Sequence, residues 1–307
     1  MKLSILDQSP VLEGKSANEA LQESLRLATF AEENGFHRFW IAEHHGFDQL
    51  ASSVPEVMLA YLGSHTHSIR LGAGAILLPH YRPYKVAETF NMLATLFPNR
   101  IDLGIGRAPG GSAEASIALS GNFLENVRKT PASIVELFHF LYHDFPPDHA
   151  YANVEALPFP LDPPEPWILG TSMKSAQSAA KHGTGYAFAH FMSDNNGKEI
   201  IRTYKDSFKV NKSIKRPYVI VAVHVICAET MEEAEAVRKL ANSRMESDSG
   251  KAEDQQMKVV IGDQKTVKHR LKQIKQAYYA DEIMIITMTD KYESRLKSYE
   301  LIAKAFM

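Results

Sequence analysis

The chain has 307 residues and carries 34 Lys plus Arg against 36 Asp plus Glu, a formal charge of −2 at pH 7. A protein dedicated to nucleic acid or to an anionic membrane surface needs a basic surplus, so this balance argues against both partners. The content of 45% hydrophobic and 23% charged residues excludes a disordered chain, and the single cysteine, Cys227, excludes an internal disulfide. We expect a soluble, cytoplasmic protein, because we find neither a signal peptide nor an apolar run of about 20 residues.

Short β-rich runs alternate with longer helical runs along the whole chain. The first half contains, in chain order, predicted strand 3–6, helix 17–34, strand 39–42, helix 55–65, strand 69–78, a helix from 83 to just before Pro98, and strand 101–105. The second half contains predicted helix 130–142, a Pro-rich irregular connection 146–166, strand 167–170, helix 172–181, strand 186–191, helix 200–210, strand 218–227, helices 231–245 and 265–278, strand 282–287 and helix 292–305.

This alternation predicts a (β/α)₈ TIM barrel, since each strand is followed by a helix and no break in composition looks like a linker. We expect one domain, 1–307, with irregular insertions near 144–166 and 247–262. A doubly wound open sheet is the alternative. Such a sheet usually has a Gly-rich phosphate turn after its first strand, whereas DQSP stands at 7–10 here.

The active site of a barrel forms where its strands end, on their C-terminal side. Polar and histidine-rich residues follow the predicted strands at this end. They are Asp7, Gln8, Ser9, Glu43, His44, His45, His80, Tyr81, Arg107, Thr171, Ser172, His190, His224, Thr287 and Thr289.

Two histidines and a carboxylate, at 43–45, are possible metal ligands. Adjacent strand residues point to opposite sides, however, so His44 and His45 cannot both face one ion unless the strand has already ended. We therefore expect no metal. One alternative has one histidine bonded to the loop and the other facing the helices. The other makes one imidazole a general acid or base, with Glu43 orienting a partner.

Two segments are candidates for binding a phosphate. Arg107 lies in a glycine-rich turn, where a guanidinium can make a bidentate contact to a phosphate, although a structural salt bridge is equally compatible with this segment. Residues 170–172, Gly-Thr-Ser, open a helix whose free N–H groups favour an anion. The same hydroxyls would also serve as an N-cap.

Glycines also interrupt the predicted strand 69–78, at Gly72 and Gly74. Glycine in a strand lowers stability unless something must approach the backbone closely. A flat aromatic ring against the strand and a β-bulge are the two interpretations.

Three motifs, IAEHH at 41–45, GAILLP at 74–79 and RIDLGIGRAP at 100–109, resemble the bacterial-luciferase-like flavin monooxygenase family. The opening SILDQSP at 4–10 is similar to the short, single-gene branch of luciferase-like oxidoreductases. The resemblance implies a (β/α)₈ barrel that binds FMN, usually as reduced flavin supplied by a separate reductase. Reduced flavin and O₂ give a C4a-peroxide in this family, which then oxygenates a small organic substrate.

The resemblance also implies roles for individual residues. His44 matches the histidine that assists catalysis beside the flavin, and Glu43 matches the neighbouring active-site carboxylate. Gly74 and Ala75 fall on the non-prolyl cis peptide that lies against the isoalloxazine. Arg107 matches the arginine that binds the FMN phosphate. The phosphate-binding turn matches Gly170, Thr171, Ser172 and Ser175.

This chain departs from the family pattern in two places. Gly106 replaces a reactive cysteine, so no thiol acts there. The segment 248–262 resembles a shortened form of the family's mobile lid, and a short lid shields the flavin from water poorly, so we do not expect efficient light emission.

We therefore expect a flavin-dependent monooxygenase whose partners are O₂, a small-molecule substrate and a flavin reductase. Two alternatives stay open: a hydride-transferring oxidoreductase that uses the deazaflavin F420, and a non-catalytic flavin-binding protein. Relatives pair through their early helices, so the resemblance also implies a homodimer.

Overall fold

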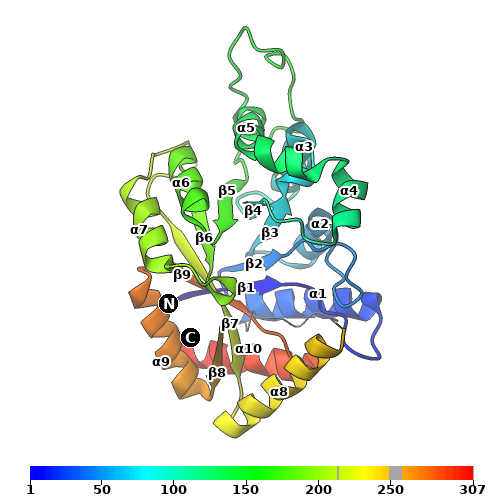
Figure 1. The fold of residues 1–307 in the computed structure, drawn as a ribbon, viewed down its shortest axis with the longest axis vertical. Coiled ribbons are helices and arrows are strands. Elements are labelled where there is room, and N and C mark those ends of the chain that lie inside the picture. The colour runs from blue at the N-terminus through cyan, green and yellow to red at the C-terminus, as the bar shows by residue number, and fades with distance from the viewer. Residues whose placement is uncertain (213, 249–257, 307) are drawn as a thin grey trace.

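The computed structural model describes residues 1–212, 214–248 and 258–306, and it describes the backbone alone for 242–248. Its central feature is a ring of parallel strands with helices around it (Figure 1). The ring consists of β1 (Lys2–Asp7), β2 (Arg38–Ile41), β3 (Arg70–Leu77), β4 (Ile101–Gly106), β5 (Glu165–Gly170), β6 (Gly185–Ala189), β7 (Val219–Cys227) and β9 (Glu282–Ile286). Because β6 pairs with β7 and β9 pairs with both β7 and β1, the sheet closes on itself. The predicted (β/α)₈ barrel is confirmed.

A ninth strand, β8 (Val259–Gly262), lies outside the ring and corrects the prediction of an irregular insertion at 247–262. The strand β7 is nine residues long, and β6 pairs only with its first half. The overhanging residues from His224 to Cys227 pair with β8 instead. The run of β8 is too short to show a period, and only its pairing with β7 makes it a strand. Residues 249–257 of this insertion, and of the predicted lid, lie outside the described residues.

Helices cover the outside of the ring. They are α1 (Ala17–Glu33), α2 (Pro55–His65), α3 (Pro83–Leu96), α4 (Ala113–Ser120), α5 (Phe123–Tyr142), α6 (Met173–His182), α7 (Gly197–Asp206), α8 (Met231–Asp248), α9 (Gln264–Ala277) and α10 (Tyr292–Phe306), with short 3₁₀ turns η1 (Leu78–His80) and η2 (His190–Met192). None of the helices in the described part is long and apolar enough to cross a lipid bilayer.

The region between β4 and β5 contains more helix than the sequence predicts. The helix α4 was missed, and α5 begins at Phe123 instead of Thr130. Pro131 lies inside α5. Because proline favours the first turn of a helix, it led the prediction to start the helix too late.

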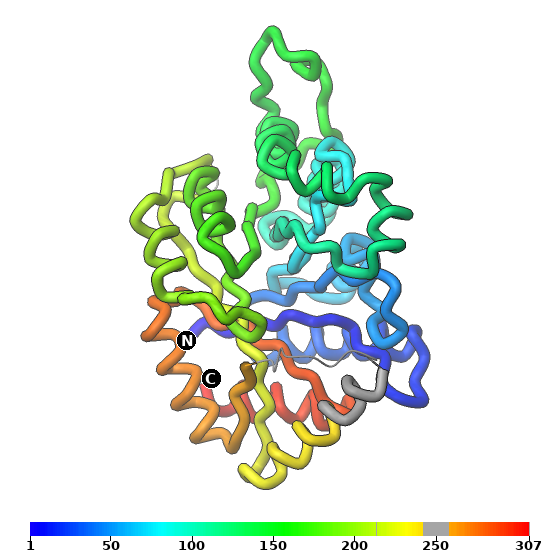
Figure 2. The backbone as a smooth tube through the Cα atoms, in the orientation of Figure 1, coloured from blue at the N-terminus to red at the C-terminus, as the bar shows by residue number. Residues whose placement is uncertain are grey.

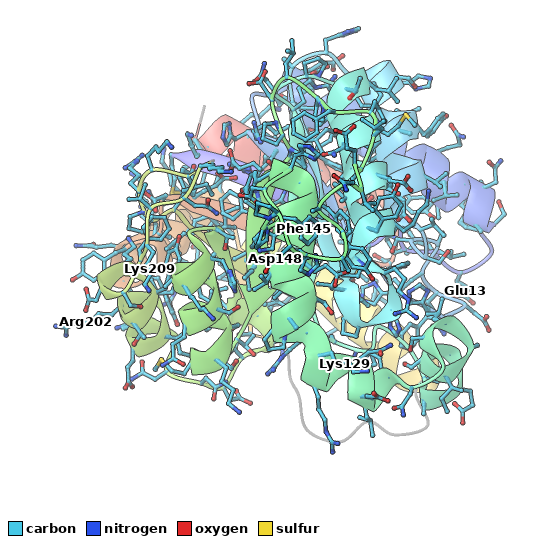
Figure 3. The ribbon with its side chains drawn as sticks, turned by 90° about the horizontal axis from the view of Figure 1, so that it is seen from above. Glu13, Lys129, Phe145, Asp148, Arg202 and Lys209 are labelled. Atoms are coloured by element: carbon cyan, nitrogen blue, oxygen red, sulfur yellow. The ribbon has the colours of Figure 1, made fainter. Side chains whose placement is uncertain are left out.

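The connection 143–164 between α5 and β5 contains turns and no helix or strand. It projects from the barrel as a long loop at the top of Figures 1 and 2. In Figure 3, which looks down on this end, Phe145 and Asp148 of the connection lie over the middle of the molecule. The ring of Phe145 contacts Phe140 of α5 at 4.7 Å between centroids, and this contact fixes the start of the loop.

Alternating strand residues build two separate cores. Outward-facing residues pack against the helices, while the inner layer is made of Leu6, Trp40, Ala42, Trp167, Ala187, Phe191, Ile220, Ala222, Met284 and Ile286. The rings of Trp40 and Trp167 meet edge to face, 5.5 Å apart, and fill the middle of the barrel.

Buried charges close the N-terminal end of the barrel. Arg38, only 2% exposed, donates to the carboxylates of Asp102 at 2.7 Å and Glu282 at 3.0 Å. Burial opposes its charge, but these two carboxylates raise the pKa of Arg38 above its ordinary value. Glu282 also accepts a hydrogen bond from the Tyr218 hydroxyl at 2.9 Å. The predicted site residues lie at the opposite end.

Candidate functional site at the C-terminal rim

His44 lies just after β2, at the C-terminal end of the barrel. The hydrogen bond from the Ala42 N–H to the Asp7 carbonyl, 2.9 Å, continues the strand ladder as far as Ala42, which lies in the inner layer with Trp40. The backbone N–H of His44 instead donates to the Ser52 carbonyl at 3.0 Å. Its Nδ1 is buried and has no hydrogen-bond partner in the described part of the chain. Burial, with a smaller effect of His45, lowers the pKa of His44 to about 4. His44 is therefore neutral near pH 7 and can accept a proton.

Glu43 occupies a different environment, on the outer side of the same segment. It is 3% exposed, and both carboxylate oxygens accept hydrogen bonds. One oxygen accepts from the backbone N–H of Leu77 at 2.9 Å, and the other from the Tyr81 hydroxyl and His45 Nε2, both at 2.8 Å. Burial and the Glu43 carboxylate raise the pKa of Tyr81 above its ordinary value. This arrangement suits a residue that positions the ends of β2 and β3.

Two histidines also hold the turn that carries Arg107. The backbone N–H of His45 donates to the Gly110 carbonyl at 2.7 Å, and Nε2 of His80 lies 2.8 Å from the Pro109 carbonyl. Gly110 has a φ of +65°, and a Cβ there would collide with the Leu77 side chain. The sequence marked His80 only as a residue near the rim, because its partner is 29 residues away.

Arg107 is exposed, and no hydrogen bond or ion pair joins it to the described residues. The alternative of a structural salt bridge is therefore not realised among them. The turn therefore presents a guanidinium whose N–H donors are not used by any described residue and can bind a ligand.

The peptide bond between Gly74 and Ala75 is cis, as the resemblance implies. The register between β3 and β4 also shifts between Ala73 and Ile76, an irregularity of the kind that the bulge interpretation predicts. Glycine is also needed at positions 72 and 74 because the ring of Trp40 packs against them, a contact that the sequence does not reveal. A Cβ on Gly72 would lie 2.5 Å from Nε1 of Trp40, and one on Gly74 would lie 2.9 Å from Cε3 of the same ring.

Residues 170–172 were interpreted as an anion site or as an N-cap, and the N-terminus of α6 has features of both. Ser172 caps the helix by accepting from the backbone N–H of Ser175, and the Ser175 hydroxyl donates back to the Ser172 carbonyl at 2.7 Å. A Cβ on Gly170 would lie 2.5 Å from the Ser175 hydroxyl. The two serine hydroxyls are thus used within the turn. The Thr171 hydroxyl has no partner in the described part, and the first N–H groups of a helix have no helical acceptor.

His224 completes the polar groups on the inner side of the barrel. It is 6% exposed and lies on the same face of β7 as Ile220 and Ala222. Its Nε2 accepts from the backbone N–H of Met288 at 3.4 Å, and its Nδ1 has no partner in the part that the structure describes. Burial lowers the pKa of His224 to about 4. In the sequence, the only indication of this site was a single histidine within a strand rich in Val and Ile.

Comparison with known proteins identifies the family. The model of the luciferase-like monooxygenase family matches residues 1–287. The chain belongs to this family. The uncharacterized protein YwcH of Bacillus subtilis is 41% identical, with 100% of this chain and 99% of that protein covered. N-acetyl-S-alkylcysteine monooxygenase of the same organism is 35% identical to this luciferase-like chain, with 100% and 98% covered.

Solved structures agree with this membership. The apo form of MsnO8 superimposes with a TM-score of 0.89 at 33% identity, covering 99% of this chain and 98% of that one. Two more distant structures share the fold. They are the FMN complex of the oxygenating constituent of 3,6-diketocamphane monooxygenase from Pseudomonas putida (TM-score 0.70, 20% identity) and an F420-dependent secondary alcohol dehydrogenase (TM-score 0.74, 14% identity). The family and these relatives support an enzyme of the oxidoreductase/monooxygenase class.

Proposed function

We propose that this luciferase-like enzyme is an FMN-dependent monooxygenase, which takes reduced FMN as a co-substrate and uses O₂ to oxygenate a small organic molecule. The observation that carries the proposal is the guanidinium of Arg107, which has no partner among the described residues and is held in a fixed turn beside the strand with the cis peptide at Gly74. An exposed guanidinium without a carboxylate partner is suited to bind a phosphate.

The residues present fit FMN. Arg107, the Thr171 hydroxyl and the free N–H groups at the start of α6 would hold the phosphate. Gly74, half-buried among buried strand neighbours, together with Ala75 would lie against the isoalloxazine. The bound reduced flavin supplies the activation of O₂.

The protein contributes position and proton handling. The buried imidazole of His44, neutral at pH 7, would accept a proton at Nδ1, which has no partner in the described part of the chain. In our proposal Glu43 positions this segment, because its oxygens are bonded to Leu77, Tyr81 and His45.

We further propose that a separate reductase supplies the reduced flavin, as the words "oxygenating constituent" imply for one fold relative. A homodimer through α2 and α3 is supported by their exposed apolar side chains Val57, Met92 and Leu96. The cytoplasmic location stays a prediction.

The test is a titration of the purified protein with oxidised FMN, reduced FMN, F420 and riboflavin, with and without O₂, followed by absorbance. We expect the wild type to bind reduced FMN and to change its spectrum on addition of O₂. Arg107→Gln should weaken FMN binding about tenfold or more, because it removes a charge-assisted contact to the phosphate. Binding of riboflavin, which has no phosphate, should change little.

Arg128→Gln on α5, which removes an exposed arginine elsewhere, is the matched control and should bind FMN like the wild type. His44→Gln should bind FMN normally and lose turnover. Tighter binding of F420 than of FMN by the wild type would support the hydride-transfer alternative instead.

A further inference from the structure

The inner face of β7 continues beyond the barrel and is covered there by α8. Ile226, two residues after His224 on the same face, packs against Ala234 of α8 together with Val237 and Val259. The helices α8 and α9 lie on opposite sides of β8 (Figure 1). His224 therefore lies at the boundary between the part of β7 that lines the barrel and the part that α8 covers.

Arg238 lies on the packed face of α8. The residues Ala234, Val237, Arg238 and Ala241 recur at helical spacing and are all buried or half-buried, whereas their neighbours Glu235 and Lys239 are exposed. Arg238 forms no hydrogen bond or ion pair within the described residues. Arg238 lies one helical turn after Ala234, and His224 lies two residues before Ile226, which packs with Ala234, so both side chains belong to the interface between β7 and α8. In agreement, the positive charge of Arg238 adds to burial in lowering the pKa of His224.

The Nδ1–H group of His224 is available as a hydrogen-bond donor. Because Nε2 accepts from the Met288 N–H, the proton of the neutral ring resides on Nδ1. This N–H is buried without a partner in the described part of the chain. A buried unsatisfied donor lowers stability, and a ligand oxygen that accepts from it would remove that loss.

We propose that His224 and Arg238 form a subsite that binds a carboxylate group of the substrate. Nδ1–H of His224 donates to one oxygen, and the guanidinium of Arg238 neutralises the negative charge. The subsite rests on the proposed function, since it orients a substrate for oxygenation on the same barrel rim. It lies on β7 and α8, whereas Arg107 and α6 follow β4 and β5, so the carboxylate is distinct from the flavin phosphate.

The test measures binding of matched acids and amides by isothermal titration calorimetry, with and without FMN. The probes are benzoate against benzamide, and N-acetyl-S-benzylcysteine against its carboxamide. We expect the wild type to bind each acid about tenfold more tightly than its amide, the ratio that one charge-assisted hydrogen bond gives. In Arg238→Gln this ratio should fall to about one, and His224→Gln should reduce it in part.

Lys239→Gln removes the same charge from the neighbouring exposed position and should keep the wild-type ratio. Circular dichroism checks that each variant is folded. A wild type that does not prefer the acids, or an Arg238→Gln variant that retains the preference, overturns the subsite. If the wild type does not bind FMN but still prefers acids to amides, the proposed function is contradicted and the carboxylate subsite is not.

Discussion

At the end of β2, consecutive residues have separate tasks. Glu43 accepts from protein donors, the buried Nδ1 of His44 has no partner among the described residues, and His45 holds the turn of Arg107. The sequence predicted chemistry at this triplet from residue types alone. It could not tell which residue meets the ligand, because that depends on Leu77, Tyr81 and Gly110, which belong to β3 and to the segments after η1 and β4.

The depressed pKa values of His44 and His224, both about 4 against 6.5 for the free side chain, predict how stability depends on pH. Between pH 4 and 6.5 the two imidazoles are protonated in the unfolded chain and neutral in the folded chain. Each histidine therefore lowers the free energy of unfolding progressively as the pH falls from 6.5 toward 4, and has no such effect above pH 6.5. Each shift corresponds to a loss on the order of 3 kcal/mol.

Urea unfolding of the wild type and His44→Gln at several pH values between 4 and 7 measures this loss. We expect the free energy of unfolding to depend less steeply on pH in the variant. Parallel pH profiles would contradict the assignment.

At the scale of elements, periodicity predicted the eight strands of the ring, but not the reason for glycine in β3. The indole of Trp40, from the neighbouring strand, fills the space that a side chain on Gly72 would need. In the same way, β8 is a strand because β7 overhangs the barrel beside it. Both features depend on contacts between elements, which one segment's sequence does not contain.

Gly72→Ala should destabilise the barrel by about 2 kcal/mol or more, because the new methyl group overlaps Trp40 and Asp102, which are fully buried. The free energy of unfolding in urea measures this effect. Gly14→Asn is the control. Gly14 has a φ of +72° with nothing within 4 Å of its Cβ position, and Asn tolerates that conformation. Equal stability of the two variants would show that the site by Trp40 can relax.

At the scale of the whole molecule, the cluster of Arg38 joins the barrel across its interior. Arg38 of β2 contacts Asp102 of β4 and Glu282 of β9, and Glu282 in turn bonds Ser4 of β1. Strands from both ends of the chain thus meet at one buried group.

Arg38→Met should destabilise the fold by about 3–5 kcal/mol, because it leaves the buried carboxylate of Glu282 without a cation in the described part of the chain and leaves Asp102 with Arg70 alone. Arg26→Met removes an exposed arginine from α1 and should change stability by less than about 0.5 kcal/mol. Thermal and urea unfolding of both variants decide the matter, and an Arg38→Met variant as stable as Arg26→Met would be incompatible with this role.

The sequence alone determined the class of fold, the order of the ring strands and the end of the barrel where polar residues gather. These properties follow from local period, helix caps and composition, which are written in consecutive residues. The resemblance located His44, Arg107 and the cis peptide at Gly74. Only the tertiary structure decided which polar groups are already used and which are free. Glu43, Ser172 and Ser175 are bonded within the protein, whereas Arg107, Arg238 and Nδ1 of His224 have no partner among the described residues. A hydrogen bond depends on distance and direction between residues far apart in the chain, and the fold must exist before either is defined.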